Sequence, residues 1–273
     1  GGRIYDSWTM TSVDFSTYQA MDVVRDGPVL MVTFNRPAEL NAINRDVHRE
    51  LESLFLDIDR DDATKVAVLT GRGRAFSAGG DLNWLLELNA DASASARAIR
   101  GDRAIQNTLL GMETPLIAKV NGPAIGLGCS MALFCDIVVA TPEATFADPH
   151  VSVGLVAGDG GALLWPQLIG YARARRYLLT GAPITGAEAA ELGLITEVAG
   201  ADDLDGVVKE WAQTLLAQPE HALRWTKVSI NAGLRVIANA VLDSAAGFEN
   251  VTQLMDAHRD ALLAMQRRQA SRR

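Results

Sequence analysis

The sequence predicts an α/β fold with a helical C-terminal region. As far as about residue 160, short apolar runs of strand length alternate with stretches of helical spacing. Beyond that point, helical stretches are separated by glycine and proline signals near residues 181–186, 200 and 219. The chain has 273 residues and no tract of eighteen apolar residues, which predicts one large domain, with or without a helical appendage, and no transmembrane helix.

A hairpin and a helix are the first elements that local signals predict. Asp26-Gly27 is a turn signal between two apolar runs, so we expect a β-hairpin over residues 21–34. Asn44 is a candidate N-cap, because the apolar residues that follow it have helical spacing. These apolar residues are Val47, Leu51, Leu54, Phe55 and Ile58.

The remaining elements alternate in type. Buried strands are expected at residues 66–69, 116–120 and 137–140, with helical segments at 82–112 and 126–134. The last helix is expected to place an apolar stripe on one side, packed on its own core or on another subunit. The stripe consists of Phe248, Val251, Leu254, Met255, Leu262 and Met265.

Net charge and cysteine content limit which partners and which cellular compartment are expected. The formal net charge of −8 argues against nucleic acid or an anionic membrane as the main partner, but is compatible with a phosphorylated ligand at a local site. Cys129 and Cys135 form no CxxC pattern, so we expect neither a disulfide framework nor a zinc site. Without a visible secretory signal, a reducing, cytoplasmic location is expected. Residues 1–9 read as an extension or a cloning remnant and carry no fold prediction.

The histidines give no metal-binding pattern. Spacing alone predicts no metal cluster, because the four histidines are scattered along the chain. His48, His221 and His258 are expected at solvated helix positions.

Two segments share the design of a strand, a glycine-containing turn and a helix start. One is residues 66–82 and the other residues 117–129. Glycine lets the backbone approach a ligand closely, and a helix start offers free N–H groups. Two such N–H groups converging on a carbonyl oxygen would form an oxyanion hole, whose donors are each worth about 10²–10³-fold in rate. The alternative is that both segments are structural loops.

At this point the chain resembles a known family. Residues 35–42 (NRPAELNA), 76–81 (FSAGGD) and 121–136 are similar to segments of the crotonase (enoyl-CoA hydratase/isomerase) superfamily. The resemblance covers most of residues 20–200 and weakly the remainder. It implies a crotonase-like spiral of ββα repeats over residues 20–200 and a helical trimerisation region over residues 201–273, with residues 1–19 as an N-terminal extension. It also implies a homotrimer or a hexamer made of two trimers.

The resemblance further implies a site for a CoA thioester. The backbone amides of Gly80 and Leu127 would hold the thioester carbonyl, and no cofactor would be needed beyond the coenzyme A of the substrate. Positions that match the substrate-binding segments are Ala38, Leu40, Ala42, Ala78, Asp81, Leu82, Pro123, Gly126, Pro149, Val153 and Gly158.

The sequence departs from the family at its two catalytic glutamates. The resemblance aligns Ser130 and His150 with those positions, and neither is a glutamate. Ser130 is a poor general base and packs or hydrogen-bonds water. His150 has an unperturbed pKa near 6.5, which suits acid–base work, or else it fills space at the pocket edge. Asp159 is a second candidate acid–base group, or a helix cap.

Several functions fit these residues. The first hypothesis is an enzyme that hydrates an enoyl-CoA or moves its double bond, through an enolate held by the two amides, with His150, Asp159 and Ser130 at the site. Decarboxylation, C–C cleavage and hydrolysis pass through related oxyanions and stay open. The alternatives from other classes are an acyl-CoA-binding protein without turnover and a structural oligomer component without a CoA site.

Overall fold

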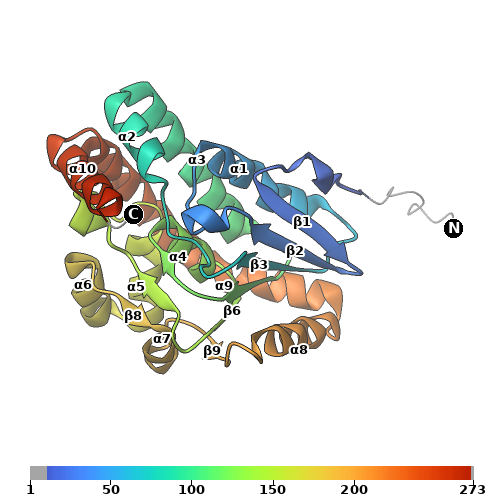
Figure 1. Cartoon of the computed structure of the whole chain (residues 1–273). Helices are drawn as coiled ribbons and strands as arrows, with labels where there is room; N and C mark the ends of the chain where they lie inside the picture. Colours follow the sequence, from blue (N-terminus) through green and yellow to red (C-terminus); the bar gives the residue numbers. More distant parts are fainter. Residues whose placement is uncertain (1–10, 272–273) are drawn as a thin grey trace, which may run out of the picture.

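The structure, a computed structural model, describes residues 11–271 (Figure 1). Residues 1–9, predicted as an extension, lie outside the described residues. The central sheet has six strands in the order β1-β2-β3-β4-β6-β9, antiparallel at the first pair and parallel thereafter. These strands are β1 (Met21–Asp26), β2 (Val29–Phe34), β3 (Val66–Gly71), β4 (Leu116–Val120), β6 (Ile137–Ala140) and β9 (Glu197–Val198).

A second, three-stranded sheet carries one of the two glycine loops. Its order is β5-β7-β8, with β5 and β7 parallel and β7 and β8 antiparallel. The strands are β5 (Ala124–Ile125), β7 (Thr145–Ala147) and β8 (Ile184–Thr185). Because β5 follows β4 directly and β7 follows β6, the second sheet continues the chain from the carboxyl ends of two central strands.

Helices enclose the central sheet. The larger apolar core joins α1 and α3 to one side of the sheet, and a smaller cluster joins α8 to the other. The helices are α1 (Arg45–Arg60), α2 (Leu82–Ala90), α3 (Ala92–Gly111), α4 (Leu127–Leu133), α5 (Gly161–Ile169), α6 (Tyr171–Thr180), α7 (Gly186–Leu192), α8 (Leu204–Leu216), α9 (Glu220–Gln253) and α10 (Asp256–Ala270), with 3₁₀ turns η1 (Phe15–Thr17), η2 (Pro37–Glu39) and η3 (His150–Val153). The predicted α/β fold with a helical C-terminal region is therefore confirmed.

Local signals placed the first elements correctly. The hairpin turns at Gly27, which has φ of +56°. The side chain of Asn44 accepts a hydrogen bond from the backbone N–H of Val47, and so caps α1 as expected. The region at 82–112 is two helices, because the Asp91 carboxylate accepts the N–H groups of Ser93 and Ala94 and starts a new helix.

Two histidines were wrongly expected in solvent. His48 is buried, with its ring nitrogens 2.9 Å from an oxygen of Asp102 and 3.2 Å from one of Glu52. His258 is also buried, and its Nδ1 lies 2.6 Å from the carbonyl oxygen of Val153. His221 is exposed, as expected. Apart from Glu52, which lies one turn along α1, the partners of these rings come from other elements, and such partners cannot be identified from the local sequence.

The C-terminal apolar stripe does not lie on one helix. The chain leaves α9 after Gln253 and begins α10 at Asp256, so the stripe is divided between two helices. Phe248 and Val251 on α9 are 63% and 54% exposed, whereas Leu262 on α10 is buried in the chain's own fold. None of the helices in residues 11–271 combines the length and apolar character needed to cross a membrane.

Candidate active site

Backbone hydrogen bonds join the two glycine loops side by side. The N–H of Ser77 donates to the carbonyl of Pro123 at 3.0 Å, and the N–H of Ile125 donates to the carbonyl of Ser77 at 2.9 Å. Gly79 has φ of +81° and lies directly against the second loop, since a Cβ built on it would be 2.6 Å from the carbonyl oxygen of Ile125. The segments that the sequence predicted as a pair therefore meet.

Each loop leaves the predicted backbone amide unpaired. In the bridge between Ile43 and the first loop, the N–H of Ile43 donates to the carbonyl of Gly79, and the N–H of Asp81 donates to the carbonyl of Ile43. The N–H of Gly80, between these two residues, takes no part in the bridge. Leu127 is the first residue of α4, where an N–H has no partner inside the helix. Within residues 11–271, neither amide donates to another protein group. Two free donors on adjacent loops are what an oxyanion hole requires.

The segment predicted to line the CoA arm packs against the first loop. The N–H of Ala78 donates to the carbonyl of Leu40 at 2.9 Å. Leu40 and Asn41 have φ of +54° and +56°, which is costly for residues other than glycine and is held here by the Asn41 side chain, which donates to the carbonyl of Ala75. Asp81 caps α2 and forms an ion pair with Arg36. Of the predicted residues on this segment, Ala38 is exposed and Ala42 is buried.

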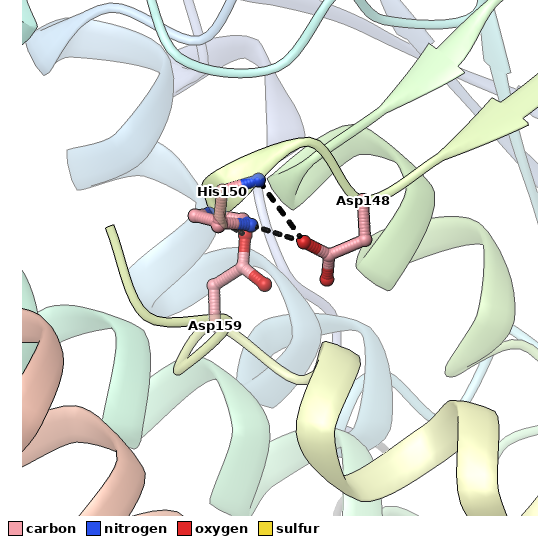
Figure 2. A group of neighbouring side chains, drawn as sticks. All are labelled: Asp148, His150 and Asp159. Atoms are coloured by element: carbon pink, nitrogen blue, oxygen red, sulfur yellow. Dashed lines mark hydrogen bonds and ion pairs between the residues drawn. The ribbon is translucent and has the colours of Figure 1, made fainter. Parts of the chain in front are cut away.

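A chain of polar side chains lies beside the second loop. His150 is at the start of η3, and a Cβ built on Gly126 would lie 3.6 Å from its Cε1. Its Nδ1 is 2.5 Å from Oδ1 of Asp148, and its Nε2 is 3.3 Å from Oδ2 of Asp159. The imidazole thus lies between the two aspartate side chains (Figure 2). The hydroxyl of Ser130, on α4, donates to Oδ1 of Asp159 at 2.9 Å.

Burial and the charges of neighbouring side chains set the protonation of His150 and Asp159. Burial alone would lower the pKa of His150, but the charges of Asp159 and Asp148 raise it well above the ordinary 6.5. Burial would raise the pKa of Asp159, but the charge of His150, with hydrogen bonds from Ser130 and the backbone of Gly161, lowers it below 3.8. At neutral pH the pair is therefore an imidazolium and a carboxylate. Oδ2 of Asp159 has no hydrogen bond among the described residues.

This arrangement suits proton transfer better than metal binding. Asp148, His150 and Asp159 each offer a ligand atom, and these atoms lie within 4.8 Å of one another. However, the two aspartates face different ring nitrogens. Ligands of one zinc ion converge on a point about 2 Å from each ligand atom. The two nitrogens of one imidazole point away from each other, so groups that face different nitrogens do not converge on one such point. The absence of a metal and of any separate cofactor stays a prediction.

The structure adds two carboxyl groups that the sequence reasoning missed. Asp148 is 2% exposed and lies two residues before His150, so an Asp-x-His pattern was available as a signal. Glu249, on α9, is 6% exposed, and nothing in the sequence connects it to the site. Of the other predicted residues, Pro149 precedes η3, whereas Val153 contacts α10 through His258.

Comparisons with known proteins identify the family. The family described as enoyl-CoA hydratase/isomerase matches residues 25–270. The short-chain-enoyl-CoA hydratase of Clostridium acetobutylicum is 33% identical over 83% of this chain and 85% of its own. An enoyl-CoA hydratase/isomerase of Mycobacterium paratuberculosis is 42% identical, with a TM-score of 0.87 over 90% of this chain and 98% of its own.

A third similar protein has a different activity in its name. It is a β-diketone hydrolase of the cyanobacterium Anabaena, bound to (S)-3-oxocyclohexyl acetic acid. It is 30% identical and has a TM-score of 0.81 over 88% of this chain and 96% of its own. The match to the family, over residues 25–270, spans the strands from β2 onward, both glycine loops and the helical region described above. The chain belongs to the enoyl-CoA hydratase/isomerase family, within the crotonase superfamily.

Proposed function

We propose that the protein adds water to the acyl part of a CoA thioester, with proton transfer by His150 and Asp159 in place of paired glutamates. The observation that carries this proposal is the buried chain of Asp148, His150, Asp159 and Ser130 beside the loop that bears the Leu127 amide. Hydration needs one group that takes a proton from water and one that delivers a proton to carbon. An aspartate that stays ionised and a histidine that stays charged meet both needs.

The chemical step can be written with its protons in balance. The amides of Gly80 and Leu127 bind the thioester oxygen. Oδ2 of Asp159 takes a proton from a water molecule, whose oxygen bonds to the β-carbon while the electron pair of the double bond moves to the thioester oxygen. The enolate then takes a proton at its α-carbon from His150, and the proton on Asp159 returns to the imidazole.

The direct test is turnover of crotonyl-CoA, followed by loss of the enoyl-thioester absorbance. We expect turnover that falls by about 10²–10⁴-fold in Asp159→Asn and in His150→Gln, because each removes one acid–base group. Glu210→Gln is the control, since it removes a charge from an exposed position on α8. Tight binding of crotonyl-CoA without any turnover would contradict hydration and favour the binding-only alternative. Double-bond migration without water uptake would assign the isomerase reaction.

A second candidate is hydrolytic cleavage of a 1,3-diketone, favoured by the 30% identity to the Anabaena β-diketone hydrolase. The same groups would serve it. Water activated by Asp159 attacks one carbonyl, the bond to the central carbon breaks, and His150 protonates that carbon to give a ketone and a carboxylic acid. A cyclic 1,3-diketone without coenzyme A is the discriminating substrate. Turnover of the diketone but not of crotonyl-CoA would replace the first proposal with the second.

The oligomeric state also belongs to the proposal. Trp225, Ile230 and Phe248 on α9 are 58%, 71% and 63% exposed, and large apolar side chains grouped on one helix are typical of subunit interfaces. With the resemblance to trimeric crotonases, they support a homotrimer or a hexamer. Sedimentation velocity measures this directly, and a monomer at micromolar concentration would contradict it.

A further inference from the structure

Glu249 presents an unusual carboxyl group at the back of the site. The residue is 6% exposed, and its Oε2 is buried without a hydrogen-bond partner among the described residues. It lies against the turn that carries Asp159, because a Cβ built on Gly158 would be 2.3 Å from this oxygen. The same Cβ would lie 2.9 Å from the backbone carbonyl of Ala245, so only glycine fits at this position. The carboxyl group therefore rests directly on the backbone before Asp159.

The groups that face Glu249 are mostly acidic. The charged groups that act on it are Asp159 in the turn before α5, His150 on η3, Asp148 after β7 and Asp102 on α3. His150 is the one positive group among them, and it already pairs with the two aspartates of the site.

The other charged groups near the contact between α3 and α9 are already paired. The charge of Asp102 is matched by His48, and Arg103 pairs with Asp243. On α10, burial lowers the pKa of His258, which keeps that ring neutral. Among residues 11–271, no lysine or arginine comes within ion-pair distance of Glu249, so the surroundings oppose a charge on it.

A carboxylate in such surroundings would be costly, and a carboxylic acid would not. A buried charge without a partner is strongly disfavoured, and the group keeps its proton instead. Burial raises the pKa of Glu249 well above 4.5, and the carboxylates of Asp159, Asp102 and Asp148 add to this against the opposing charge of His150. Burial and the neighbouring carboxylates therefore favour the protonated acid, and the charge of His150 opposes them.

We propose that Glu249 is a positioning residue, an uncharged carboxylic acid that supports the turn at Gly158 and leaves the charge of His150 to be set by Asp148 and Asp159 alone. The inference rests on the proposed function, in which His150 and Asp159 transfer the protons. A carboxylate at this position would hold the proton on His150 more tightly and make the imidazolium a weaker acid. The uncharged state of Glu249 therefore keeps His150 able to donate its proton.

The first test reads the proton on Glu249 without any substrate. In protein labelled with ¹³C-glutamate, infrared spectroscopy at neutral pH should show the carbonyl band of a buried protonated acid. The band should disappear in Glu249→Gln and persist in Glu210→Gln. If the wild-type protein lacks such a band at neutral pH, the proposal is overturned, whether or not the variant folds.

The second test reads the effect on His150. With four histidines in the chain, ¹⁵N-histidine spectra are simple, and His150→Gln identifies the resonances of His150. We expect His150 to titrate at the same pH in the wild-type protein and in Glu249→Gln, because an uncharged carboxylic acid and an amide at this position both leave its charge to Asp148 and Asp159. A higher titration pH of His150 in the wild-type protein would show a negative charge on Glu249 and would overturn the proposal. Neither test needs turnover, so loss of the proposed hydratase activity and loss of this inference are separate outcomes.

Discussion

Asp148→Asn should lower the pKa of His150 by about 1–3 units, which is the range for an opposite charge at short distance. The carboxylate that is removed lies 2.5 Å from Nδ1 of His150 and is 2% exposed. With a charge separation of about 4 Å and an effective dielectric constant of about 20, the attraction is about 4 kcal/mol. At about 1.36 kcal/mol per pKa unit this corresponds to roughly 3 units, an upper value because asparagine still accepts a hydrogen bond.

Two measurements check this prediction. ¹⁵N spectra of labelled histidine give the pKa of His150 in the wild-type protein and in Asp148→Asn. The alkaline limb of kcat/KM should move to lower pH by the same amount, because it reports the loss of the proton from the free enzyme's acid. Asp205→Asn is the matched control, since Asp205 pairs with Lys119 on the surface and its side chain is 82% exposed. If His150 titrates at the same pH in all three proteins, Asp148 does not set its charge.

Two further predictions concern the oxyanion loop and the pH dependence of stability. Gly79→Ala places a Cβ 2.6 Å from the carbonyl oxygen of Ile125, so the adjacent amide should shift and kcat should fall by about 10²–10³-fold, while the control Gly111→Ala, with open space around it, keeps full activity. The ion pair of His150 and Asp159 stabilises the fold fully between pH 3.8 and pH 6.5. This stabilisation is lost as the pH rises through the raised pKa of His150, and also as the pH falls through the lowered pKa of Asp159. The melting temperature should therefore decline above pH 6.5, and a rise between pH 6.5 and 9 would refute this reasoning.

Local signals account for the parts of the fold that the sequence predicted. The turn at Gly27 and the cap at Asn44 act within a few residues, so their effects are visible in a short window of sequence. The same holds for the free amide of Leu127, which follows from its place at the start of a helix. Asp91 is also a local signal, because aspartate is a frequent N-cap and here it marks the boundary between α2 and α3.

The missed features depend on contacts between distant elements. His48 is buried because Asp102, on another helix, satisfies its ring. Glu249 reaches the site only because α9 passes behind the turn at Gly158. The candidate acid–base residues His150 and Asp159 could be named from the sequence, but the charge on His150 could not, because it depends on burial and on the charges of Asp159 and Asp148.

Asp148, His150 and Asp159 all lie on one stretch of chain between β7 and α5, whereas the two amides come from earlier segments. This separation has a consequence for how the protein can evolve. On the proposed function, substitutions within residues 148–159 can alter the acid–base groups while the two amides proposed to hold the carbonyl stay in place. On the proposed function, exchange of this segment between relatives would replace both acid–base residues in one event.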